Sequence, residues 1–197
     1  MYQAVAKKIV NFLVRKEIIK EEEKEIYTYG YEVVIAQSVY ILLMIVIACV
    51  CSSLIETILF FIGFYVYRSV AGGYHAKTYL KCHMIFALNQ ILFTIMLHSF
   101  LDDRRYVFIL LTCVAVITIT LICAPIDHPN KPFTSKEKRK FRKWSHSVSI
   151  AFVTLMIIAM FVDGNNVYGF CISAGVCSAS LSLLYAYIER RVLNAKN

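Results

Sequence analysis

The chain has 197 residues, of which 59% are hydrophobic, and it carries a formal net charge of +8. A soluble domain is about 45–50% apolar, and here the excess lies in long runs, which argues against an ordinary soluble globular protein. The cations lie in short segments between those runs, so we expect anionic lipid headgroups as partners and no nucleic acid. With only 7 Gly and 3 Pro, the chain lacks long linkers and predicts one integral membrane domain over residues 1–197.

Residues 1–25 are polar and amphipathic. Such a helix is suited to lie along a membrane surface, although a solvated helical tail would show the same pattern. A cleavable signal peptide is not expected, because no apolar core closely follows the first cations. The apolar residues that recur at near-helical spacing among the cations are Val5, Ile9, Phe12, Leu13 and Ile19.

Six apolar segments follow, each close to the roughly 20 residues that a bilayer crossing needs. The predicted fold class is therefore all-α: a polytopic integral membrane protein with six transmembrane helices and an amphipathic N-terminal helix. The spans are predicted at residues 32–51, 54–70, 84–101, 106–124, 145–162 and 167–188. The last span holds small residues that favour close helix packing, namely Ser173, Ala174, Gly175, Ser178, Ala179 and Ser180.

Lys and Arg are distributed very unevenly between the two sides that six spans define. Nineteen of the 21 fall on one side, and only Arg104 and Arg105 fall on the other. Cytoplasmic loops carry the excess of cations, so the pattern predicts a multi-pass protein of the cell membrane with both termini in the cytoplasm.

The seven cysteines are an odd number, and their spacing does not suggest a disulfide framework. Only Cys82 lies in a polar, cation-rich segment, where the pKa of a thiol can fall and its reactivity rise. The other six lie within or beside apolar runs and are interpreted as small packing residues: Cys49, Cys51, Cys113, Cys123, Cys171 and Cys177.

Cys82 has a histidine, His75, upstream in the same segment between the second and third spans. A thiolate is a strong nucleophile, and a histidine can take its proton and later return it to a leaving group. Arg68 and Lys77 could stabilise the thiolate or bind a substrate carboxylate. These residues predict a cysteine nucleophile with its base at the cytoplasmic face, although a His and a Cys can also share a loop by chance.

The glycine pair Gly72 and Gly73 lets the backbone approach a substrate closely and could offer N–H groups to an oxyanion. The seven-residue spacing of His75 and Cys82 raises a geometric problem. On one ideal helix they would lie about 10.5 Å apart along the axis, whereas a nucleophile and its base must approach to about 2.6–3.2 Å. We therefore predict that this segment is not one straight helix, but bends between Ala76 and Leu80 or forms a re-entrant loop.

The stretch resembles the accessory gene regulator B (AgrB) family of Gram-positive bacteria, which are membrane cysteine endopeptidases that process a quorum-sensing propeptide. The family pattern is an Arg, a glycine turn, a His-Ala pair and a Cys seven residues after the His. A second feature is an Ala-Pro element after the fourth span, leading to Lys-Pro and a basic loop. The matching residues are Arg68, Gly73, His75-Ala76, Cys82, Ala124-Pro125 and Lys131-Pro132.

The resemblance implies a definite mechanism. Cys82 would attack a peptide bond of an AgrD-like propeptide with His75 as base, and the C-terminal part of the propeptide would leave. The acyl group would remain on Cys82 as a thioester until a cysteine or serine inside the substrate closed a thiolactone or lactone ring. The resemblance also implies a homodimer and a thiol protease that requires no cofactor.

Several of these residues have simpler interpretations. Arg68 could be an interfacial anchor, Gly72 and Gly73 only a turn, and Lys77 one of the cytoplasmic cations. A loop bounded by prolines holds Asp127, Asn130 and Lys131, which could touch the propeptide or orient His75, or only form a capped turn. A zinc site is disfavoured because His75, Cys82 and His83 lack a fourth ligand.

Two other function classes fit six spans. One is a peptide transporter or exporter without protease activity, although the chain has no charged residue in the middle of a span to act as a coupling site. The other is a membrane adaptor that presents basic loops, which would leave the His75 and Cys82 pair unexplained.

Overall fold

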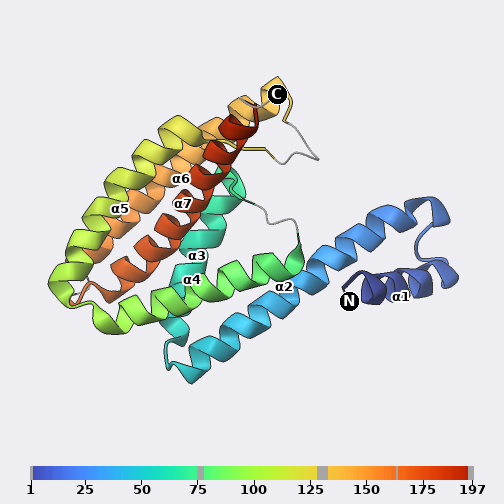
Figure 1. Ribbon diagram of the computed structural model, residues 1–197, viewed down its shortest axis with the longest axis horizontal. Coiled ribbons are helices and arrows are strands. Elements are labelled where there is room, and N and C mark those ends of the chain that lie inside the picture. The colour runs from blue at the N-terminus through green and yellow to red at the C-terminus, as the bar shows by residue number, and fades with distance from the viewer. Residues whose placement is uncertain (1, 75–77, 128–132, 163, 195–197) are drawn as a thin grey trace. The chain divides into compact units, whose positions relative to one another are not determined.

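A computed structural model describes residues 2–74, 78–127, 133–162 and 164–194 (Figure 1). These residues form helices and connecting turns with no strand among them, which confirms the all-α fold class. The elements are α1 (Tyr2–Arg15), the 3₁₀ turn η1 (Glu21–Glu23), α2 (Lys24–Val50), α3 (Leu54–Ala71), α4 (Tyr79–Ser99), α5 (Asp102–Cys123), α6 (Ser135–Val162) and α7 (Val167–Asn194).

The six helices α2 to α7 are long and apolar enough to cross a membrane, as predicted. Their ends differ from the predicted spans. Helix α6 begins at Ser135 rather than at residue 145, and α2 begins at Lys24 rather than at residue 32. The added turns of α6 are rich in Lys and Arg, and those of α2 hold Lys24, Glu25 and several Tyr, so they are less apolar than the predicted spans and a hydropathy pattern does not detect them.

The described chain divides into two compact units, residues 1–50 and residues 51–197, and whether they make one domain stays a prediction. In the first unit α1 packs on α2, with Ala6 and Val10 fully buried. Helix α1 is shorter than predicted because Glu17 adopts the left-handed conformation (φ 56°), and the N–H of Ile18 donates to the carbonyl of Leu13. These are the features of a helix C-terminus.

In the second unit α7 packs against α3, α5 and α6, while α4 runs across them at an angle (Figure 1). Helices α3 and α7 approach so closely that a β-carbon at Gly175 would lie 2.0 Å from the carbonyl oxygen of Phe60. A β-carbon at Gly63 would lie 2.7 Å from the carbonyl oxygen of Ile172. This contact agrees with the close packing predicted from the small residues of the last span.

Buried hydroxyl groups connect three helices of the second unit. The Tyr67 hydroxyl on α3 lies 2.7 Å from Thr120 Oγ1 on α5, which lies 2.9 Å from Ser149 Oγ on α6. Ser149 in turn donates to the carbonyl of Ser145 at 2.7 Å. All of these side chains are at most 1% exposed, so the network satisfies polar groups that no water reaches.

Candidate functional site

The turn that follows α3 requires a glycine at its first position. Gly72 has φ 84° and ψ −166°, a conformation almost restricted to glycine, and its N–H donates to the carbonyl of Arg68 at 3.0 Å. A β-carbon there would lie 2.2 Å from the carbonyl oxygen of Ile126, whose N–H donates to the carbonyl of Ala71 at 3.1 Å. The close approach predicted at the glycine pair is therefore made by the chain itself, and a contact of Gly72 with substrate stays a prediction.

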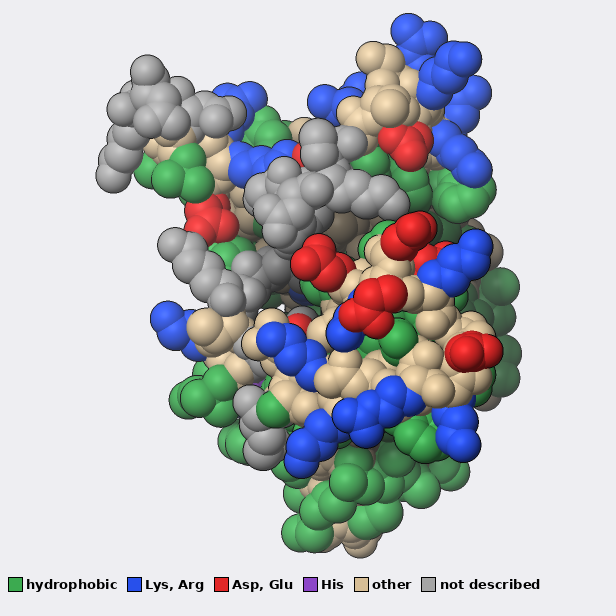
Figure 2. Space-filling view, turned by 90° about the vertical axis from the view of Figure 1, so that its right-hand side faces the viewer, with side chains coloured by type: hydrophobic (Ala, Val, Ile, Leu, Met, Phe, Trp, Pro, Cys, Tyr) green, Lys and Arg blue, Asp and Glu red, His purple; other side chains and the backbone are tan. Residues whose placement is uncertain are grey.

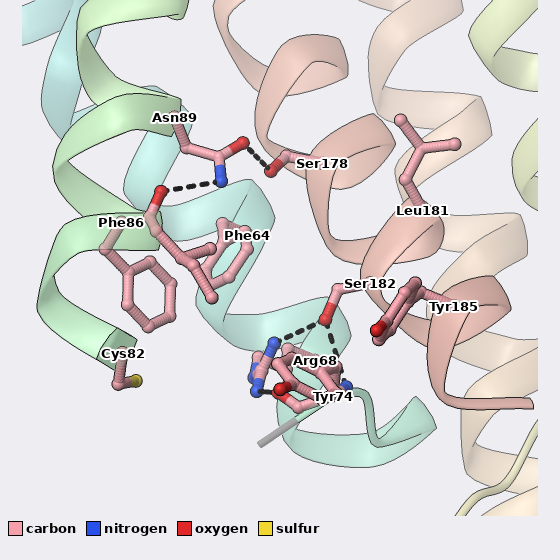
Figure 3. A pocket seen from close by; sticks show the side chains of 11 residues that line it. Phe64, Arg68, Tyr74, Cys82, Phe86, Asn89, Ser178, Leu181, Ser182 and Tyr185 are labelled. Atoms are coloured by element: carbon pink, nitrogen blue, oxygen red, sulfur yellow. Dashed lines mark hydrogen bonds between the residues drawn. The ribbon is translucent and has the colours of Figure 1, made fainter. Parts of the chain in front are cut away.

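Arg68, on the last turn of α3, is held from two sides. Its Nη1 donates to Ser182 Oγ on α7 at 2.7 Å, and its Nη2 donates to the carbonyl oxygen of Tyr74 (Figure 3). The guanidinium carbon also lies 5.6 Å from the ring centroid of Phe64 and 5.8 Å from that of Phe86. Arg68 thus makes contacts within the protein that the interfacial-anchor interpretation did not include.

The glycine next in the chain leaves room for these contacts. A β-carbon at Gly73 would lie 3.0 Å from Ser182 Oγ and 3.2 Å from Arg68 Nη1. Tyr74 follows, and its ring packs edge-on against Tyr185 of α7, with 4.9 Å between the centroids. Residues 72–74 therefore pack between α3 and α7.

Cys82 lies in the first turn of α4, after the extended N-cap residue Thr78 (φ −137°, ψ 146°). Its N–H donates to the carbonyl of Thr78 at 3.1 Å. The first turn of a helix carries partial positive charge and favours an anion such as a thiolate. Because α4 begins only at Tyr79, the segment 68–83 is not one straight helix, which confirms that prediction. His75, Ala76 and Lys77 lie outside the described residues.

Cys82 and Arg68 line the same pocket, which has a volume of about 360 Å³ and lies between α3, α4 and α7 (Figure 3). From half-buried Cys82 the pocket extends along one face of α4 to Asn89, whose Oδ1 accepts a hydrogen bond from Ser178 Oγ at 2.7 Å. Most of the side chains between these two ends are apolar. The lining residues are Phe64, Arg68, Tyr74, Cys82, Ile85, Phe86, Asn89, Ser178, Leu181, Ser182 and Tyr185.

Asp127 has partners within the protein, and its predicted contact with the propeptide or with His75 stays a prediction. Its carboxylate forms an ion pair with Arg190 of α7 and accepts a hydrogen bond from the N–H of Phe133 at 2.9 Å. Burial alone would raise the pKa of Asp127, but the bonds from Phe133 and Arg190 outweigh it, so the pKa lies below its ordinary value. The predicted site residues Asn130 and Lys131 lie outside the described residues.

Of the residues that line the pocket, only Arg68 and Cys82 were predicted as site residues. The polar lining residues that were not predicted are Tyr74, Asn89, Ser178, Ser182 and Tyr185. Ser182 and Arg68 are 114 residues apart in the chain, so only the packing of α3 on α7 brings them together. The signal in the sequence was the run of small residues on α7, which ends at Ser180, two residues before Ser182.

The basic run before the fifth span is the first part of α6. Glu137 Oε2 accepts from Thr134 Oγ1 at 2.8 Å and from the N–H of Thr134 at 2.9 Å, which is the capping-box arrangement. Figure 2 shows Lys and Arg side chains grouped at the upper end of the molecule, the end at which α6 begins in Figure 1. Lys140 Nζ lies 4.6 Å from the ring centroid of Trp144. Such a surface suits anionic headgroups.

Comparison with known proteins agrees with the motif. The family model described as Accessory gene regulator B matches residues 6–183. The chain belongs to this AgrB family. AgrB-like protein 2 of Clostridium perfringens (strain 13 / Type A) is 21% identical over 151 residues, which cover 74% of this chain and 71% of that protein. No solved structure matches the chain.

Family membership confirms the resemblance drawn from the central stretch. It connects this AgrB-family protein with the agr quorum-sensing system and, in general terms, with the processing of a propeptide. Together with the six apolar helices it indicates a multi-pass membrane protein.

Proposed function

We propose that this AgrB-family protein is a membrane-embedded cysteine endopeptidase that removes the C-terminal part of an AgrD-like autoinducer propeptide. Cys82 is the nucleophile and His75 is its base. One observation carries the proposal: Cys82 lies in the first turn of α4 and shares a pocket with the guanidinium of Arg68. A helix N-terminus and a nearby cation are the surroundings in which a thiol becomes reactive.

The reaction has two acyl transfers. The Cys82 thiolate attacks the scissile carbonyl, and His75 passes the thiol proton to the departing amine, so that the C-terminal peptide leaves and the rest is bound as a thioester. A cysteine thiol or serine hydroxyl of the bound peptide then attacks this thioester. That step closes a thiolactone or lactone ring and returns the Cys82 thiol.

The second transfer succeeds only if the internal nucleophile reaches the thioester before water does. The pocket supports this requirement, because Phe64, Phe86 and Leu181 give it largely apolar walls. Asn89 and Ser178 hydrogen-bond to each other at its far end, so they do not hold water there as strongly as two unpaired groups would.

The distribution of Lys and Arg supports a site at the cytoplasmic face with both termini inside. The proposal includes contacts between the basic start of α6 and anionic lipids, and a homodimer as the working form. Labelling of single cysteines at residues 3 and 104 in intact cells tests the orientation. Residue 104 is expected to react with an impermeant reagent, and reaction at residue 3 would reverse the topology.

The activity is tested with purified protein and its propeptide in lipid nanodiscs. Wild-type protein is expected to release the C-terminal fragment, whereas Cys82→Ala and His75→Ala abolish the release. Cys113→Ala, which removes a buried cysteine of α5 outside the pocket, is the matched control and retains it. Cleavage by Cys82→Ala would exclude Cys82 as nucleophile. Transport of intact propeptide without cleavage by wild-type protein would favour a transporter.

A further inference from the structure

The hydroxyl of Ser182 is the point at which three parts of the second unit meet. Ser182 Oγ on α7 accepts from Arg68 Nη1 of α3 at 2.7 Å and from the N–H of Tyr74, in the turn after α3, at 3.1 Å. The carbonyl oxygen of Ser182 also accepts from the Tyr74 N–H at 3.2 Å. Figure 3 shows these groups together at the end of the pocket where Cys82 lies.

Both backbone polar groups of Tyr74, its N–H and its carbonyl oxygen, are hydrogen-bonded. Its N–H is bound by Ser182 and its carbonyl oxygen by Arg68. Tyr74 directly precedes His75 in the sequence. The Ser182 and Arg68 contacts therefore fix the point from which the chain continues to the proposed base.

Ser182 also restricts Arg68. An arginine side chain has many rotamers. Its guanidinium is a rigid planar group, so little conformational entropy is lost for each hydrogen bond that holds it. The hydroxyl of Ser182 occupies one donor and the carbonyl of Tyr74 another, while Phe64 and Phe86 lie near the guanidinium. Because Gly73 has no side chain, it leaves the space that the Arg68 guanidinium and the Ser182 hydroxyl occupy.

We propose that Ser182 is a positioning residue: its hydroxyl holds Arg68 at the Cys82 end of the pocket and fixes the Tyr74 peptide before His75. This inference rests on the proposed function. Ser182 is not proposed as a second nucleophile, because its oxygen accepts from a cation and an amide at once, which occupies both lone pairs. Small errors of position at a reacting centre cost up to about 10²-fold in rate, so the hydroxyl acts on rate rather than on affinity.

The test compares Ser182→Ala with Ser180→Ala. Ser180 is on the same helix, and its hydroxyl donates to the Cys177 carbonyl of that helix at 2.8 Å. We expect Ser182→Ala to lower the single-turnover cleavage rate about tenfold or more, with the propeptide concentration for half-maximal rate changed less than about twofold. Ser180→Ala should retain the wild-type rate. Equal losses in the two variants, or a loss only of affinity, would overturn the assignment.

A double-variant cycle tests whether Ser182 acts through Arg68. Arg68→Lys keeps the charge but loses the fork that bonds Ser182 and Tyr74. If the two residues act as one unit, Ser182→Ala combined with Arg68→Lys is no slower than Arg68→Lys alone. Losses that multiply would mean that the Ser182 hydroxyl acts independently of Arg68, which would overturn the role of Ser182 in holding Arg68.

A measurement without propeptide separates this inference from the proposed function. The rate at which iodoacetamide alkylates Cys82 is followed by peptide mass spectrometry at neutral pH. Ser182→Ala is expected to slow it several-fold, about as much as Arg68→Lys, because a displaced guanidinium supports the thiolate less. Unchanged alkylation in Ser182→Ala would overturn the inference even if wild-type protein cleaves the propeptide. Slowed alkylation with no wild-type cleavage would support the Ser182 contact and reject the peptidase.

Discussion

Gly72 and Ile126 are in contact through backbone atoms alone: a β-carbon on Gly72 would lie 2.2 Å from the Ile126 carbonyl oxygen. Gly72 also has φ 84°, which strains any other residue. We therefore expect Gly72→Ala to cost roughly 2 kcal/mol or more of stability, seen as a lower thermal unfolding midpoint in detergent. Gly30→Ala is the control, because a β-carbon at this position within α2 meets nothing within 4 Å and favours the helix. Equal midpoints for Gly72→Ala and wild-type protein would contradict the packing described here.

The Asp127–Arg190 ion pair predicts a pH dependence of stability. The pKa of Asp127 is lowered in the folded protein, so the carboxylate stabilises the fold above the pKa of an unfolded aspartate, about 3.9. This contribution is lost as the pH falls below that value and through the folded pKa. Thermal midpoints measured from about pH 6 to about pH 2.5 should show the loss in wild-type protein and a weaker one in Asp127→Asn.

The exposed Asp103 at the start of α5 supplies the matched variant for this pH series. Asp103→Asn is expected to keep the wild-type dependence, because most surface substitutions change stability little. If Asp127→Asn titrates like wild-type protein and Asp103→Asn does not, another carboxylate controls the acid response.

The contact of α3 with α7 at Gly175 predicts a loss of both stability and activity. The added methyl of Gly175→Ala would lie 2.0 Å from the Phe60 carbonyl oxygen, so the two helices must separate. We expect a cost of about 1–3 kcal/mol and slower propeptide cleavage, because Arg68 and Ser182 lie on the same two helices. Gly164→Ala, which meets nothing within 4 Å, should leave both unchanged. Retained stability in Gly175→Ala would show that the helices are not in backbone contact.

The buried hydroxyl network predicts an order of effects. Tyr67→Phe removes one group and leaves Thr120 bonded to Ser149 and to the Val116 carbonyl, so the cost should be about 1 kcal/mol. Thr120→Val removes the shared partner of two buried hydroxyls and should cost about 2 kcal/mol or more. Denaturant titrations in detergent compare the variants, and a larger loss in Tyr67→Phe would refute this arrangement.

Sequence reasoning succeeded where a local pattern encodes the result. The apolar runs gave the six long helices, because the bilayer demands roughly twenty apolar residues for each crossing. It misplaced the helix ends, as at Ser135. The run from Lys136 to Lys143 favours a helix but is polar, so a search for apolar segments does not include it. The N-terminal helix was predicted too long because it ends at Glu17 in the left-handed conformation, and a glutamate does not indicate that conformation as a glycine would.

The residues of the site likewise fall into those that a local motif predicts and those that depend on tertiary packing. Cys82 and Arg68 were selected from one short motif, and they line one pocket. Ser182 could not be selected, because a serine on an apolar helix is usual and its role depends on the approach of α3 to α7. Asp127 was selected for its place in a polar loop, whereas its partner Arg190 of α7 was not selected. Long-range pairing of this kind requires the tertiary structure.

The central claim is that Cys82 carries the acyl group. The most direct measurement is intact mass spectrometry of wild-type protein, Cys82→Ala and His75→Ala after incubation with propeptide, followed by mapping of any adduct. The account predicts a thioester on Cys82, equal in mass to the propeptide without its released C-terminal fragment, and no adduct in either variant. Release of the fragment with an adduct on another residue, or an adduct that persists in Cys82→Ala, would contradict it.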